Sequence, residues 1–160
     1  MRLVLDRAAT TDEAVELLGH YDMLALMGRD YHFFISDATG KAVAVEYDCN
    51  TPERTMTVTP INVITNFYIM YGQDVYLSEE AQKYGHGYDR FETILDILCR
   101  EDGAYSRNTV WDCLQQSSQL PKPDDITSNT QWSVVYDHAN LSADVVQRRH
   151  WEETHHFVVG

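Results

Sequence analysis

The run YHFFISDATGKAVAVEYD, residues 31–48, is the segment that most strongly indicates a fold class, because it has the pattern of a β-hairpin. Two β-rich runs, about 31–36 and 41–48, flank the tetrapeptide Asp37-Ala38-Thr39-Gly40. Aspartate at the first turn position and glycine at the last favour a tight turn. In the second run alanines alternate with larger side chains, and such small residues indicate a strand that is covered on both faces.

Helices are predicted on both sides of this hairpin. Thr10 and Glu13 have the spacing of a capping box, and apolar residues then recur at helical spacing up to a stop at Gly28. The second helix has apolar residues at i, i+3, i+4 and i+7. The predicted helices cover residues 11–27, about 88–101, and a stretch that begins at Ser106.

Further short β-rich runs predict the remaining strands. These strands are expected at 54–60, 62–66, 130–137, 143–151 and 154–160. Pro60 lies between the first two, where it removes no central ladder bond. Strands that come in hairpins and helices that come in clusters indicate a single α+β domain, residues 1–160, with antiparallel sheet and helices layered on it.

The predicted strand 62–66 ends on the amide side chain of Asn66, beside Phe67 and Tyr68. Asparagine is common where a strand gives way to a turn, so one interpretation is that Asn66 only begins a turn. The other is that the strand delivers an amide N–H to a reaction centre. Composition and spacing leave these two interpretations open.

Composition excludes several partners. The chain has 160 residues and a net charge of −13, whereas binding to nucleic acid or to anionic lipid depends largely on Lys and Arg. We therefore expect neither partner. No apolar run approaches the roughly 20 residues that cross a bilayer, so no membrane span is expected. The three cysteines show no CxxC spacing, which favours reduced thiols and a reducing compartment, the cytoplasm.

Few side chains are candidates for chemistry. His150, His155 and His156 come closest to a ligand cluster, but no Cys or carboxylate completes a metal set, so neither a metal nor a cofactor is expected. Cys99 and Cys113 fall on helix faces that the pattern assigns to the core, which leaves Cys49 as the thiol expected to be exposed. No glycine-rich phosphate loop is found.

Arg90 is expected at the start of the second helix, where the positive end of the helix dipole disfavours a cation. A solvated arginine would lose only a few tenths of a kcal/mol there after screening. The alternative is that an anionic partner or a functional requirement holds a cation at this position. The pattern alone supports both interpretations equally.

Several segments, taken in order, resemble the choloylglycine hydrolase family. HFFISDATGKAVAVEY at 32–47 resembles its H…D…G…viE hairpin, and VITN at 63–66, followed by Gln73, resembles the segment with its oxyanion asparagine. GYDRFETI at 87–94 resembles the segment with its helix-start arginine. TQWSVVYDHANLSADVVQRRHW at 130–151 resembles its closing hairpin. The family includes bile salt hydrolases, penicillin V acylases and acyl-transferases that act on penicillin nuclei.

The resemblance implies a fold and a reaction. The family belongs to the N-terminal-nucleophile hydrolases, which have a four-layer αββα fold and cleave linear amide C–N bonds with an N-terminal cysteine. It implies that Asn66 donates to the oxyanion and that Arg90 supports charge near the nucleophile. The implied substrate is a small N-acyl amide, which is either hydrolysed or used for acyl transfer.

The chain departs from the family at its start, which reads Met1-Arg2 and not Cys. We therefore expect it to be the C-terminal part of such an enzyme, inactive by itself, with the nucleophile on a preceding segment. A half-fold would leave apolar strand faces open, so we also expect a homo-oligomer or a partner segment. The alternative is a non-catalytic α+β binding or assembly module that keeps the scaffold without the chemistry.

Overall fold

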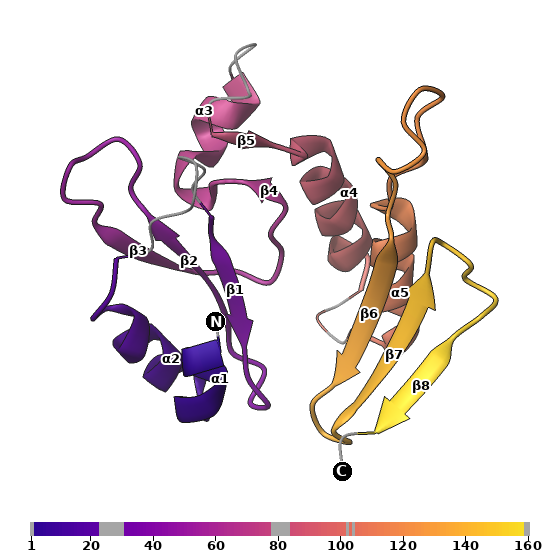
Figure 1. Ribbon diagram of the computed structural model, residues 1–160, viewed down its shortest axis with the longest axis horizontal. Coiled ribbons are helices and arrows are strands. Elements are labelled where there is room, and N and C mark those ends of the chain that lie inside the picture. The colour runs from indigo at the N-terminus through magenta and orange to yellow at the C-terminus, as the bar shows by residue number, and fades with distance from the viewer. Residues whose placement is uncertain (1, 23–30, 78–83, 102, 104, 159–160) are drawn as a thin grey trace. The chain divides into compact units, whose positions relative to one another are not determined.

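The computed structural model is a mixed α and β protein with small antiparallel sheets and a few helices (Figure 1). It describes residues 2–22, 31–77, 84–101, 103 and 105–158. The chain divides into two compact units, Met1–Tyr88 and Asp89–Gly160, and each is described by itself. This confirms the α+β class. None of the helices in the described ranges is long and apolar enough to cross a membrane.

The first unit is built on the predicted hairpin. Strands β1 (Phe33–Ser36), β2 (Ala42–Tyr47) and β3 (Met56–Pro60) form an antiparallel sheet in the order β1-β2-β3. The turn has the expected chemistry: the Gly40 N–H donates to the Asp37 carbonyl at 3.1 Å, and Gly40 has φ +87°. The Asp37 carboxylate also accepts a hydrogen bond from the Thr11 N–H at 2.8 Å, which ties the turn to the start of the helix that begins at Thr11.

Helices α1 (Arg2–Arg7) and α2 (Thr11–Leu18) pack on one face of this sheet. The shared core consists of Val4, Ala14, Leu18, Phe33, Val43, Val45 and Tyr47. The capping box of Thr10 and Glu13 is present as predicted. The predicted helix 11–27 is too long, because α2 ends at Leu18 with Gly19 as its C-cap. Residues 23–27 and the predicted stop at Gly28 lie outside the described residues.

The other face of β2 is also covered, as its alanines indicate. Residues 43–47 are all buried. Side chains alternate along a strand, so Ala44 and Glu46 point away from the helices. On their side lies the 3₁₀ helix η2 (Ile69–Tyr71), which continues into α3 (Gly72–Leu77). The first unit also contains the two-residue strands β4 (Asn66–Phe67) and β5 (Gly85–His86).

The second unit contains α4 (Tyr88–Cys99, whose first residue belongs to the first unit), α5 (Arg107–Gln116), β6 (Trp132–Asp137), β7 (Ser142–Gln147) and β8 (His155–Val158). The three strands pair antiparallel in the order β6-β7-β8, which confirms that closing strands are present, although the predicted strand 143–151 is too long because β7 ends at Gln147. Helix α5 packs against β6 and buries Cys113 and Thr109. Ser106, the predicted first residue of this helix, is its N-cap.

Candidate functional site

Asn66 begins a short strand, whereas the sequence pattern predicts that it ends one. Residues 62–65 form no strand, and the predicted strand 62–66 is therefore wrong. β4 pairs antiparallel with β5, with Asn66 opposite His86 and Phe67 opposite Gly85. The Tyr68 N–H extends the pairing by donating to the Tyr84 carbonyl at 2.9 Å. The Asn66 residue is exposed, while the next residue, Phe67, is 2% exposed.

Glycines make the close approach of these two strands possible. Gly85 has φ +110°, and a Cβ at this position would lie 2.5 Å from the Phe67 Cα and overlap the Asn66 carbonyl oxygen. Gly87, at φ +89°, accepts a hydrogen bond from the Thr65 hydroxyl at 2.8 Å. The glycines of the segment YGHGY thus allow a tight ribbon that fixes the backbone of Asn66.

A buried carboxylate fixes the chain just after Asn66. Glu46 on β2 is fully buried. Its two oxygens accept the backbone N–H groups of Ile69 at 2.6 Å and Met70 at 2.8 Å. Its Oε1 also lies 3.1 Å from His32 Nδ1. Glu46 is not among the sequence-predicted site residues, although a lone acid in a strand with two covered faces requires buried partners.

A second polar cluster links the end of β2 to η2. The Tyr71 hydroxyl donates to Asp48 at 2.5 Å, the Tyr71 and Tyr84 rings stack at 4.2 Å, and Asn50 Nδ2 donates to the Tyr84 hydroxyl at 3.1 Å. Burial, together with the Asp48 carboxylate, raises the pKa of Tyr71 to about 12. The hydrogen bond from Tyr71 is the largest cause that lowers the pKa of Asp48. Tyr71 therefore remains a neutral donor at physiological pH.

The cysteines differ in part from their predicted environments. Cys113 is buried as expected, and burial raises the pKa of its thiol. Cys99 is exposed, so its assignment to the core is wrong. It is the last residue of α4, two residues after Ile97, which is buried. Cys49, expected to be exposed, is half-buried.

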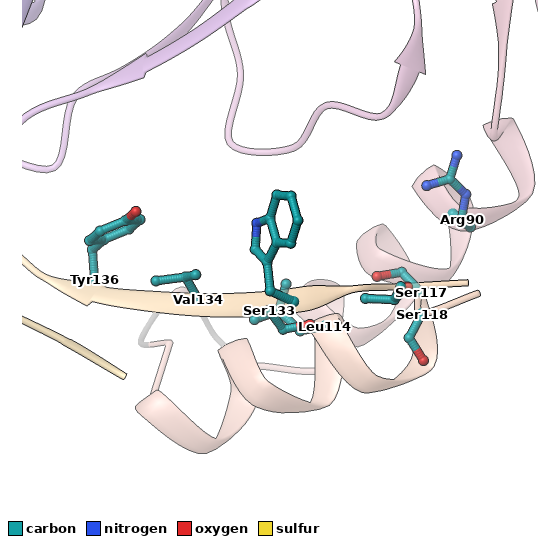
Figure 2. Close-up of a pocket in the computed structure, with 9 residues that line it drawn as sticks. Arg90, Leu114, Ser117, Ser118, Ser133, Val134 and Tyr136 are labelled. Carbon is teal, nitrogen blue, oxygen red and sulfur yellow. The ribbon is translucent and has the colours of Figure 1, made fainter. Parts of the chain in front are cut away.

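Arg90 lies in the first turn of α4, as predicted, and lines an open groove of about 380 Å³ in the second unit (Figure 2). Ser117 and Ser118, just after α5, line the same groove, and Figure 2 shows both near Arg90. Their hydroxyl protons are donated to the carbonyls of Cys113 at 2.7 Å and Gln115 at 2.6 Å. Ser118 Oγ also accepts a hydrogen bond from Arg149 Nε at 3.0 Å, so the hydroxyls of both serines are engaged with other parts of the protein.

Of the three histidines near the C-terminus, His156 helps to hold strands together. His156 Nδ1 lies 2.7 Å from the buried carboxylate of Asp144, which also forms an ion pair with Arg107. This arrangement joins β8, β7 and the start of α5. His155, on the opposite face, lines a polar cavity of about 310 Å³ with His150. Across the described residues, no group of three His, Cys, Asp or Glu side chains is arranged to hold a metal ion.

The two sequence-predicted site residues belong to different units, Asn66 to the first and Arg90 to the second. Comparison of the chain with protein-family models, with curated proteins and with solved structures finds no match.

Proposed function

We propose that the chain carries the oxyanion-stabilising part of a cysteine N-terminal-nucleophile enzyme acting on linear amide bonds. The observation that carries this proposal is the setting of Asn66. An exposed amide side chain stands on a ribbon whose backbone is fixed by β5 on one side and by Glu46 on the other. Stabilisation of a developing charge requires donors that are held in place before the reaction begins.

In the proposed reaction, the thiolate of an N-terminal cysteine bonds to the amide carbonyl carbon, and the carbonyl π electrons move onto oxygen. The α-amino group takes the thiol proton and passes it to the leaving amine, because its ordinary pKa of about 7.7–8.0 suits a base near neutral pH. Asn66 Nδ2–H donates to the oxyanion. Collapse of the tetrahedral intermediate breaks the C–N bond, releases the protonated amine and leaves a thioester. Water or an acceptor amine then attacks the thioester carbonyl, the C–S bond breaks, and the acid or new amide leaves as the cysteine thiol is regenerated.

Arg90 has a supporting role in this proposal. Arg90 lines the groove together with Ser117 and Ser118. Its guanidinium has N–H donors only, which suits the carbonyl oxygen of an N-acyl amide and the negative charge that develops near the nucleophile. A cation at a helix start, which the dipole disfavours, is then retained because it supports that charge.

The layering within each unit is compatible with a four-layer αββα fold. In the first unit, α1 and α2 cover one face of a sheet, and in the second, α5 covers one face of β6–β8. We propose that the nucleophile lies on a segment that precedes the residues resembling the family, because none of Cys49, Cys99 and Cys113 stands at a processing junction of the family type.

The test is turnover of a panel of N-acyl amides by an enzyme that joins this chain to an N-terminal-cysteine segment. We expect amine release by the joined enzyme and none by the 160-residue chain. Turnover by the chain alone that is lost on Cys49→Ala would contradict the proposed site. No turnover by the joined enzyme, with correct processing confirmed by mass spectrometry, would contradict the proposed reaction.

An assembly module is the second candidate, and the exposed face of β6–β8 favours it. Trp132, Tyr136 and Phe157 are 70%, 68% and 56% exposed. The register places all three on one face, since Tyr136 and Phe157 both pair with Ala143 and Trp132 is four residues before Tyr136. Figure 2 shows Tyr136 on the side of β6 that faces away from α5. Such a face is typical of an interaction surface.

A further inference from the structure

The buried carboxylate of Glu46 has no counterpart in the proposed reaction and requires its own explanation. Burying an ionised group is costly unless it is paired and hydrogen-bonded. Glu46 has three partners: the N–H groups of Ile69 and Met70, one on each oxygen, and His32 Nδ1. An ionised carboxylate only accepts hydrogen bonds, so His32 Nδ1–H donates to it.

The two backbone donors belong to the start of a helix. The first N–H groups of a helix have no partner within it. Here the N–H groups of Ile69 and Met70 donate to Glu46 on β2, which is 23 and 24 residues earlier in the chain. Negative charge at this end is also favoured by the helix dipole. Glu46 therefore acts as an N-terminal cap supplied by β2, and it sets where η2 begins.

The start of η2 in turn constrains Asn66. Ile69 follows Asn66 by three residues, and the two residues between them, Phe67 and Tyr68, are buried. A shift of η2 cannot be absorbed by loose chain over this distance. The pairing with β5 holds the same segment from the other side. The backbone that carries Asn66 is therefore held between two fixed points.

We propose that Glu46, oriented by His32, is a positioning residue that holds the Asn66 amide at the geometry needed for oxyanion binding. The catalytic consequence rests on the proposed function, whereas the positioning is a property of the first unit alone. Glutamine is nearly isosteric with Glu46 but replaces one acceptor oxygen by an N–H₂ donor. Its N–H₂ group would therefore face the backbone N–H of Ile69 or of Met70, and two donors cannot form a hydrogen bond.

The first experiment measures positioning without activity. Amide hydrogen exchange and the Asn66 side-chain ¹H–¹⁵N signals are recorded for the parent chain, for Glu46→Gln and for the exposed control Glu53→Gln. Loss of a charged hydrogen bond should speed exchange at Ile69 and Met70 roughly 10- to 100-fold. We expect the Asn66 signals to shift only in Glu46→Gln. Faster exchange with unchanged Asn66 signals would show that Glu46 only caps η2 and would overturn the inference.

The second experiment is a kinetic double-mutant cycle in the enzyme that contains the N-terminal cysteine. Glu46→Gln should lower kcat with little change in KM, and it should have little further effect once Asn66→Ala is present, because both act through one donor. Full additivity would overturn the positioning role. A normal kcat for Asn66→Ala would contradict the proposed function instead, while the exchange experiment still decides whether Glu46 positions Asn66.

A variant pair at His32 covers the case in which Glu46→Gln does not fold. His32→Leu removes the donor to Glu46, whereas His32→Asn places an amide N–H₂ close to the position of Nδ1. We expect the Asn66 signals and kcat to change in His32→Leu and to return toward the parent values in His32→Asn. Equal effects of the two variants would show that packing, and not the hydrogen bond to Glu46, matters at this position.

Discussion

Substitution of Gly85 by alanine should break the ribbon that presents Asn66. The added Cβ would lie 2.5 Å from the Phe67 Cα and 2.8 Å from the Asn66 carbonyl carbon. Both neighbours are backbone atoms, which cannot move aside as a flexible side chain can. The strands must therefore separate, and the hydrogen bond between the Tyr68 N–H and the Tyr84 carbonyl is lost with them.

Gly40 provides a matched control in the same unit. Its φ of +87° is also positive, but a Cβ there meets nothing within 4 Å. Gly40→Ala should therefore cost only the backbone strain, about 1–2 kcal/mol. Gly85→Ala adds overpacking of about 1–3 kcal/mol and the loss of hydrogen bonds worth about 1 kcal/mol each. We expect Gly85→Ala to be about 2–4 kcal/mol more destabilising than Gly40→Ala.

The assay is urea unfolding followed by far-ultraviolet circular dichroism, with the cross-strand NOE between Asn66 and His86 recorded in native buffer. The tryptophans, at 111, 132 and 151, all lie in the second unit, so their fluorescence would not report on this region. Equal free energies of unfolding for the two alanine variants, with the NOE retained, would refute the close approach of β4 and β5.

Three further predictions concern other groups. The Thr39 hydroxyl and the Thr11 N–H hold the pKa of Asp37 well below its usual value. The free energy of unfolding should therefore fall as pH drops below about 4. Acid-unfolding curves of Asp37→Asn should show a smaller dependence on pH in this range. Because the pKa of Tyr71 is raised to about 12, the stability that its protonated form contributes should be present below about pH 10 and be lost as pH rises to about 12. Phenolate absorbance would follow the titration, and the free energy of unfolding of Tyr71→Phe should depend less on pH in this range. The chain should self-associate at micromolar concentration through the exposed face of β6–β8, and light scattering should show a smaller mass for Trp132→Asp; a parent mass of one chain would count against this surface.

The parts of the fold that the sequence predicts are those set by neighbouring residues. The hairpin at 31–48 depends on a turn of four residues and on alternation within each strand. The capping box of Thr10 and Glu13 joins groups three residues apart. Interactions of this kind form in the same way whatever the rest of the chain does, so their spacing alone indicates them.

Long-range interactions explain where the predictions fail. Residues 62–65 include the β-branched Val63, Ile64 and Thr65, but they pair with none of the strands that the structure describes, and the pattern carries no information about partners. The pattern likewise extends the helix past Leu18, although the chain turns there at Gly19. η2 begins at Ile69 because Glu46, more than 20 residues earlier, accepts its first N–H groups.

The candidate site is predictable only in part, for the same reason. Asn66 and Arg90 are found by resemblance, and their places at the start of β4 and in the first turn of α4 come from the structure. Glu46 is visible in the sequence only as a charge in a strand expected to be buried on both faces. The role of Gly85 and Gly87, on either side of His86, follows only from the pairing of β5 with β4.

The most direct test of the central claim is the steady-state kinetics of Asn66→Ala in the enzyme that contains the N-terminal cysteine. Asn62→Ala, also exposed and only four residues earlier, is the control. We expect kcat to fall by about 10²–10³ in Asn66→Ala with KM nearly unchanged, since the donor acts on charge that exists only in the transition state. Asn66→Asp should be equally slow or slower, because a carboxylate repels the oxyanion. A kcat near that of Asn62→Ala in either Asn66 variant would contradict the assignment of Asn66 as the oxyanion donor.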